Sequence, residues 1–185
     1  AKTHPNVTAV GVNTSATYNA GATDVQDLGA AMATGVAYLR AMTDAGMSID
    51  DACRQIAFTV AVGTDQFLSI AKLRAARMLW ARVTEACGAS EDARSMTLNV
   101  DISDRVLTQR DPWVNLLRIT VGVFAGAVAG ADSITSPSFE APLGLPTGFG
   151  RRIARNTQII LAEESHLGQI IDPAGGSWYV ETLTN

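Results

Sequence analysis

The chain has 185 residues, the length of one domain or two small ones. Hydrophobic residues make up 47% and charged residues 17%, which excludes intrinsic disorder and supports a packed core. The formal net charge of −4 gives no basic field for phosphate groups, so we expect no nucleic-acid partner.

Short β-branched segments alternate with long amphipathic segments, a pattern that predicts β-α units and a parallel sheet. The segments are too short to span a bilayer, and the most apolar of them is Ile119–Ala131. The expected strands, in chain order, are Val7–Val12, Ile56–Val62, Met96–Asp101, Asp132–Thr135 and Gln169–Ile171.

Capping residues mark where the helices should begin. Thr23 and Gln26 have the spacing of a capping box, and Asp111–Pro112 fits an N-cap followed by the first helical position. The clearest helix, Asp65–Ala86, has a solvated side, where we expect Lys72, Arg77, Arg82 and Glu85. Its apolar stripe consists of Phe67, Ile70, Ala71, Leu73, Met78, Leu79 and Val83. The expected helices begin at Thr23, Ser48, Asp65, Asp111, Thr147 and Ser177.

Five such units fit either an open doubly wound sheet or most of a (β/α)₈ barrel, because a closed barrel takes about 250 residues. The strands of an open sheet covered by helices would be nearly continuous Val, Ile and Leu. Small polar residues instead interrupt the strands here, which favours a barrel with a polar lining without excluding the open sheet. These lining positions are Thr8, Thr59, Asn99, Ser133 and Thr135.

Few side chains, considered by themselves, point to a particular binding or catalytic site. The two histidines, His4 and His166, are too few for a histidine metal site, so we expect no metal ligands. The glycine-rich segment 144–150 precedes a helix with Arg151, Arg152 and Arg155, which could reach an anion or simply be solvated. Tyr18 and Asn19 follow the first strand, at the end where barrel enzymes keep their sites.

The two cysteines, Cys53 and Cys87, do not make a disulfide framework, and they indicate a reducing compartment. The chain also shows no pattern typical of a secretory signal. We therefore expect a cytoplasmic protein that does not span a membrane.

Six longer strings, in this order, carry a resemblance to a known family. They are Ile70–Trp80 (IAKLRAARMLW), Leu107–Asn115 (LTQRDPWVN), Leu143–Thr147 (LGLPT), Arg152–Gln158 (RIARNTQ), Glu163–Ser165 (EES) and Asp172–Glu181 (DPAGGSWYVE). Together they resemble the methylmalonyl-CoA mutase family over essentially the whole chain.

The resemblance implies a fold of the α/β class: a partial (β/α)₈ TIM barrel with about five parallel strands and flanking helices. Residues 1–185 would be a single domain, the C-terminal part of that barrel, without a cobalamin-binding domain. The family interconverts methylmalonyl-CoA and succinyl-CoA with adenosylcobalamin, and its coenzyme A arm threads the barrel axis. The Asp-x-His-x-x-Gly motif that binds cobalamin is absent, so we expect another chain to hold the cofactor.

The polar residues of catalytic family members are largely replaced here. Tyr18, which precedes Asn19, replaces an amide side chain that contacts the substrate. Gly63 replaces a histidine that contacts the thioester, and Thr135 replaces a second histidine. The resemblance therefore implies substrate-site positions at Tyr18, Asn19, Gly63 and Thr135, but no catalytic residue in this chain.

These substitutions resemble the noncatalytic small subunit of heterodimeric members, whose partner is a larger catalytic subunit. The alternatives are a divergent catalytic acyl-CoA mutase barrel that uses cobalamin on a separate chain, and a module that binds acyl-CoA without turnover. Without the first three barrel strands, the edges at Val7 and Ile171 would be open, so we expect the chain to be a fragment of a longer one or to pair with a second copy through these edges.

Overall fold

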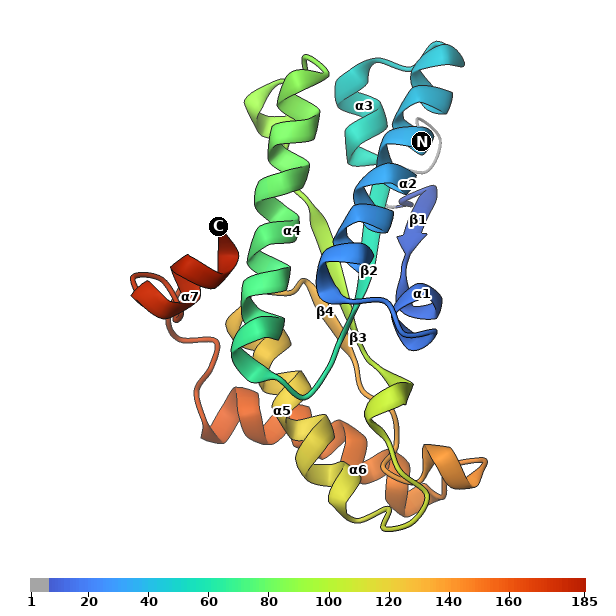
Figure 1. The fold of residues 1–185 in the computed structure, drawn as a ribbon, viewed down its shortest axis with the longest axis vertical. Helices are drawn as coiled ribbons and strands as arrows, with labels where there is room; N and C mark the ends of the chain where they lie inside the picture. Colours follow the sequence, from blue (N-terminus) through green and yellow to red (C-terminus); the bar gives the residue numbers. More distant parts are fainter. Residues whose placement is uncertain (1–6) are drawn as a thin grey trace.

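The computed structural model describes residues 7–185, and it contains one four-stranded parallel sheet with the strands in chain order. Figure 1 shows the sheet behind the helices α2, α4 and α5. The α/β fold expected of a partial barrel is thus confirmed. The strands are β1 (Val10–Asn13), β2 (Ile56–Val62), β3 (Thr97–Ile102) and β4 (Ser133–Thr135).

The helices begin close to where capping chemistry places them. Thr23 and Gln26 form the expected capping box, and the side chains of Ser48 and Asp65 accept from backbone N–H groups three residues on. The α-helices are α1 (Ser15–Asn19), α2 (Asp24–Asp44), α3 (Ile49–Arg54), α4 (Gln66–Ala86), α5 (Val114–Val128), α6 (Gly148–Ile159) and α7 (Trp178–Thr184). Short 3₁₀ turns occupy Glu91–Ala93, Asp104–Val106 and Ala141–Leu143, and a π-helical turn, Ile160–Glu164, extends α6.

The core lies between one face of the sheet and the helices. Phe58 of β2 and Trp80 of α4 meet edge to face with ring centroids 4.7 Å apart, and both are fully buried. A Cβ on Gly35 of α2 would come within 2.8 Å of the Trp80 ring and 2.9 Å of the Phe58 ring. Glycine at position 35 therefore lets α2 pack directly on this aromatic pair.

Helix α5 approaches the sheet through its small residues. A Cβ on Gly122 would lie 2.7 Å from Ile102, and one on Gly126 would lie 3.1 Å from Ile134. The helix begins at Val114, however, rather than at Asp111–Pro112. Residues 111–113 form a turn in which the Asp111 carbonyl accepts from the Val114 N–H, and no side chain caps α5.

The opposite face of the sheet carries small and polar residues. Parallel pairing aligns Asn13, Thr59, Asn99 and Ser133 in one row across all four strands, and Ala61, Asp101 and Thr135 in the next row. The Ser133 hydroxyl donates to Asn99 Oδ1 at 2.6 Å along the first row. Because side chains alternate along a strand, all of these residues lie on the face opposite the one that packs on α2, α4 and α5.

Two expectations about strands are wrong. The first strand begins at Val10, so Thr8 lies outside the sheet, exposed, and does not line it. Residues 169–171 form bends instead of a fifth strand. Arg74 of α4 pairs with Asp172 and with Glu181, the latter at 2.7 Å, and this holds the segment against the helical layer instead of beside β4. The open edges of the sheet are consequently β1 and β4, not Ile171.

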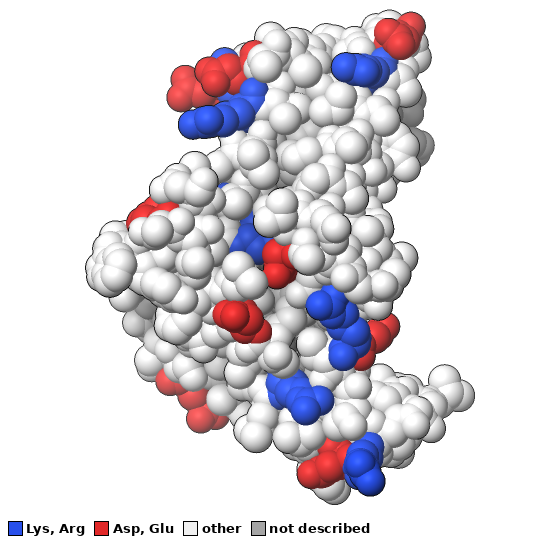
Figure 2. Space-filling view, viewed as in Figure 1, with Lys and Arg blue, Asp and Glu red and all other residues white. Residues whose placement is uncertain are grey.

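Charges on the helical face occur as small separate groups rather than as a continuous basic or acidic field (Figure 2). Within residues 7–185, no helix combines the length and apolarity needed to cross a bilayer.

Candidate functional site

The candidate site lies where β1, β2 and β3 end, and helix α1 brings Tyr18 and Asn19 to it. Ser15, the first residue of α1, donates through its hydroxyl to Asp101 Oδ2 at 2.8 Å, and Asn19 Oδ1 accepts from Ser103 Oγ at 2.6 Å. Helix α1 is thus tied at both ends to β3 and the residue after it. This helix has five residues, and sequence periodicity could not reveal it.

Tyr18 is buried, with 6% of its surface exposed, and two cations contact its ring. Lys72 Nζ lies 3.8 Å from the ring centroid and Arg105 Cζ lies 4.3 Å from it. Arg105 also donates to the Tyr18 backbone carbonyl at 2.7 Å. Burial raises the pKa of the Tyr18 phenol, as does the nearby Asp24 carboxylate, while Arg105 opposes the shift. The side chain is therefore a fixed, neutral phenol at physiological pH.

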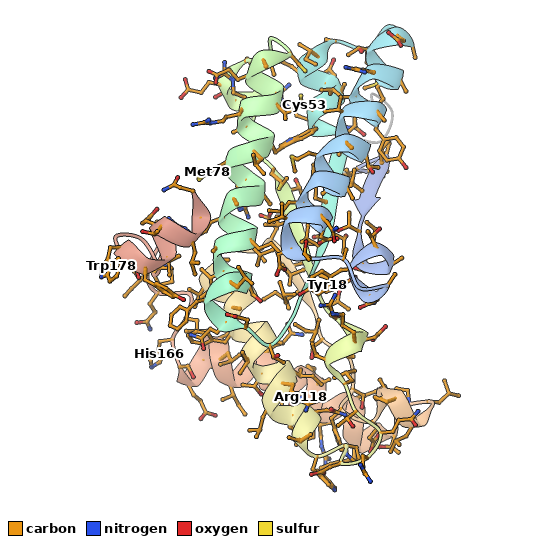
Figure 3. The ribbon with its side chains drawn as sticks, viewed as in Figure 1. Tyr18, Cys53, Met78, Arg118, His166 and Trp178 are labelled. Atoms are coloured by element: carbon orange, nitrogen blue, oxygen red, sulfur yellow. The ribbon has the colours of Figure 1, made fainter. Side chains whose placement is uncertain are left out.

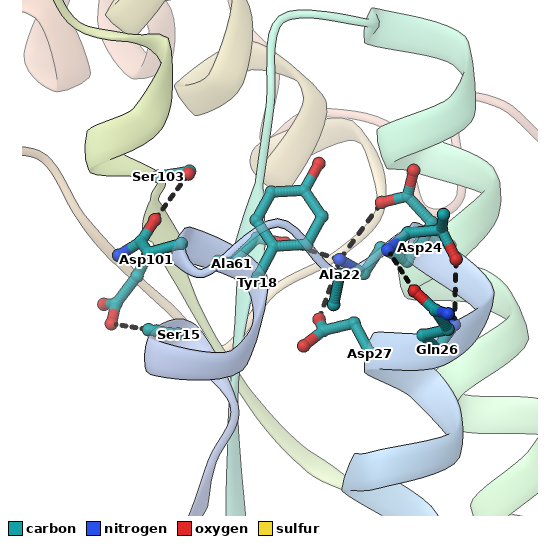
Figure 4. A network of polar contacts seen from close by, with 12 residues as sticks. Ser15, Tyr18, Ala22, Asp24, Gln26, Asp27, Ala61, Asp101 and Ser103 are labelled. Atoms are coloured by element: carbon teal, nitrogen blue, oxygen red, sulfur yellow. Dashed lines mark hydrogen bonds and ion pairs between the residues drawn. The ribbon is translucent and has the colours of Figure 1, made fainter.

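Lys72 is the centre of a buried ionic cluster, and its side chain has no solvent exposure. Its ammonium lies 3.1 Å from Asp24 Oδ1 and 2.8 Å from Asp27 Oδ2, and donates to the Ala61 carbonyl at 2.9 Å. In Figure 4, Tyr18 stands between this cluster and the Ser15–Asp101 pair. The ammonium makes two ion pairs and one hydrogen bond, so Lys72 ties α4 to α2 and to β2.

The expectation that Lys72 faces solvent is wrong, and so is part of the expected apolar stripe of α4. Phe67, Met78 and Leu79 are 40–47% exposed, whereas Leu73 and Trp80 are fully buried. The signal was present in the helical period: Lys72 shares a face with the buried positions 69, 73, 76 and 80. A lysine on that face predicts a buried partner, which α2 supplies.

Gly63 directly follows β2, and it faces Tyr18. A Cβ built on Gly63 would lie 3.1 Å from the Tyr18 hydroxyl oxygen, so the phenol occupies the space of a side chain at position 63. Position 63 offers no side-chain donor, and the Tyr18 phenol lies where such a side chain would begin.

Thr135 and Asn19 line one small hollow of about 190 Å³ together with Asp101, Ser103 and Asp104. The structure thus places all four expected site residues at one end of the sheet, where Tyr18 meets Gly63 and Asn19 meets Thr135 across the hollow. Thr59, Asn99 and Ser133 lie one row below, on the polar face.

The residues at this end do not fit a cobalt or zinc ligand set. Among residues 7–185, no three His, Cys, Asp or Glu side chains are grouped as metal ligands. His166 is exposed at the end of the π-helical turn, on a segment that Figure 3 shows well away from Tyr18. The groups at this end of the sheet pack, form ion pairs and make hydrogen bonds.

Comparisons with known proteins agree with the motif strings. The family described as methylmalonyl-CoA mutase matches residues 1–185. A methylmalonyl-CoA mutase small subunit of Streptomyces virginiae is 52% identical over 98% of this chain, and that of Propionibacterium freudenreichii subsp. shermanii is 48% identical over 100%. A methylmalonyl-CoA mutase of Escherichia coli is 42% identical over 90%. The chain spans 29% of the two small subunits and 23% of the third protein.

Proposed function

The chain belongs to the methylmalonyl-CoA mutase family, and we propose that it acts as a noncatalytic part of a mutase small subunit. In this role it supports a larger catalytic subunit that interconverts methylmalonyl-CoA and succinyl-CoA. The two relatives named small subunits support the assignment, since they are more similar to this chain than the E. coli enzyme is.

The observation that carries the proposal is the contact between Tyr18 and Gly63. A catalytic barrel needs donors aimed at the thioester and carboxylate of its substrate, and removing one such donor typically costs about 10²–10³ in rate. Here a buried phenol fills the end of β2, and both cations nearest to it are already engaged. The site geometry therefore favours packing over turnover.

Adenosylcobalamin would belong to the complex and would not be bound by these 185 residues alone. The Asp-x-His-x-x-Gly motif is absent from this sequence. When bound, the group supplies radicals by homolysis of its cobalt–carbon bond. This chain would contribute scaffold and subunit contacts, in the cytoplasm, where its unpaired Cys53 and Cys87 would stay reduced.

One observation supports the second candidate, an acyl-CoA-binding module. The row Asn13–Thr59–Asn99–Ser133 presents amide and hydroxyl groups along the face opposite α2, α4 and α5. That face would suit a pantetheine arm. Self-association is a separate proposal, in which a second copy of the chain would cover the edges of β1 and β4.

The deciding experiment is reconstitution of the mutase. The protein carrying this chain is co-expressed with a larger mutase subunit, and methylmalonyl-CoA turnover is measured with adenosylcobalamin for each subunit and for the pair. We expect co-purification, and turnover only when the larger subunit is present. Turnover by this chain's protein with cobalamin on a separate carrier would overturn the proposal, and coenzyme A affinity without turnover would favour the binding module. Light scattering of the protein alone tests self-association.

A further inference from the structure

A basic hollow of about 530 Å³ lies between the segment after β4 and helix α6. Five lining residues carry possible hydrogen-bond donors: the hydroxyls of Ser136 and Ser138, the guanidinium groups of Arg151 and Arg155, and the amide of Gln158. It shares no lining residue with the hollow at Asn19 and Thr135.

The two arginines stand one helical turn apart on α6 and so face the same side. Arg151 is held in place because its Nη1 donates to the Pro146 carbonyl at 2.7 Å. Within residues 7–185, no carboxylate lies within 4 Å of Arg151 or Arg155. The part of the chain that the structure describes therefore leaves both positive charges uncompensated, side by side.

The other wall of the hollow, formed by Ser136 and Ser138, packs closely against α6. Ser138 is buried, and its Oγ accepts from the Glu140 N–H at 3.3 Å, which leaves the hydroxyl proton available to donate. A Cβ on Gly150 would clash with both Ser138 Oγ and Glu140 Oε2, so glycine lets the first turn of α6 press against this serine and this carboxylate. Thr147 caps the helix, and Glu140 accepts from Thr147, which directs that carboxylate to the cap and not to the arginines.

We propose that this hollow binds the phosphate group of a small phosphate ester. Two guanidinium forks, two hydroxyls and an amide supply more donors than the two oxygens of a carboxylate can accept, whereas a phosphate offers three. The volume leaves room for the organic part of an ester beside Ile159 and Ala154. The inference is independent of the proposed subunit function.

The test is a binding titration of the purified protein at low ionic strength. Binding is measured by calorimetry or by changes in amide chemical shifts. The probes are inorganic phosphate, phenyl phosphate and acetate. Arg151→Gln and Arg155→Gln remove the proposed ligands. Arg152→Gln is the matched control, because Arg152 lies 5.5 Å from the Phe149 ring and does not line the hollow.

We expect both phosphates to bind, phenyl phosphate more tightly, and acetate at least about tenfold more weakly. Each of the two ligand substitutions should weaken phosphate binding about tenfold, and Arg152→Gln less than twofold. Equal losses in all three variants would mean nonspecific attraction and overturn the proposal, as would wild-type binding retained in the Arg151→Gln/Arg155→Gln double variant. Ser136→Ala, which carries no charge change, should weaken phosphate binding without changing its salt dependence.

Discussion

The hydroxyl oxygen of Tyr18 lies 3.1 Å from the point where a Cβ on Gly63 would stand. The two positions are therefore coupled: a side chain at 63 and a tyrosine at 18 compete for one volume. The resemblance to catalytic family members implies that both positions differ from theirs, and the contact gives a physical reason for the differences to occur together.

The first prediction follows from this coupling. Gly63→Ala should destabilise the protein by about 1–2 kcal/mol, because the phenol must shift by a few tenths of an ångström in a packed site. In a Tyr18→Phe background, which lacks the hydroxyl, the same substitution should cost less than half as much. Urea unfolding of the four proteins in the cycle measures the interaction. Strictly additive effects would show that the two positions are not in contact.

The second prediction concerns pH. Burial and Asp24 raise the pKa of Tyr18 above its ordinary value of about 10, so between these two pKa values the unfolded chain releases a proton that the folded protein keeps. The stabilisation is complete below about pH 10 and is lost as the pH rises through the raised pKa. Relative to Tyr18→Phe, the wild type should lose unfolding free energy above pH 10. A wild-type advantage that is constant or grows with pH would contradict the assignment.

The third prediction tests the buried ion cluster. Lys72→Met leaves Asp27, which has no solvent exposure, without its cation, and should cost about 3–5 kcal/mol of unfolding free energy. Asp27→Asn in the Lys72→Met background should recover part of that loss, because it removes the uncompensated charge. Arg82→Met, an exposed position on the same helix, is the control and should change stability by less than about 0.5 kcal/mol. A Lys72→Met effect as small as the control's would mean that the cluster is solvated.

Local sequence signals predicted the caps of α2 and α4 and the polar face of the sheet, because a capping box and strand alternation act within a few residues. They failed where distant residues decide the structure. The sequence Gln169–Ile171 has strand propensity. Arg74, about a hundred residues earlier in the chain, nevertheless pairs with Asp172 and Glu181 and holds the segment on the helical layer.

In the candidate site, too, some features follow from the sequence and others depend on contacts between distant residues. The resemblance located Tyr18, Asn19, Gly63 and Thr135, and all four lie at one end of the sheet. Nothing local to Tyr18 predicts its contacts with Lys72 and Arg105, which come from two other elements. Such contacts depend on how α4 and the turn after β3 approach α1, and this is a property of tertiary packing.

The last prediction compares two glycines in helix α2. Gly35→Ala places a methyl group within 2.8 Å of the buried Trp80 ring and should destabilise the protein by about 1–3 kcal/mol. Gly29→Ala meets nothing within 4 Å, so the better helix propensity of alanine should stabilise the protein by up to about 1 kcal/mol. Both variants make the same chemical change in the same helix, so opposite signs in thermal or urea unfolding isolate the packing contribution. If both stabilise, α2 can move away from the Phe58–Trp80 pair at little cost, and the close contact at Gly35 does not determine the position of the helix.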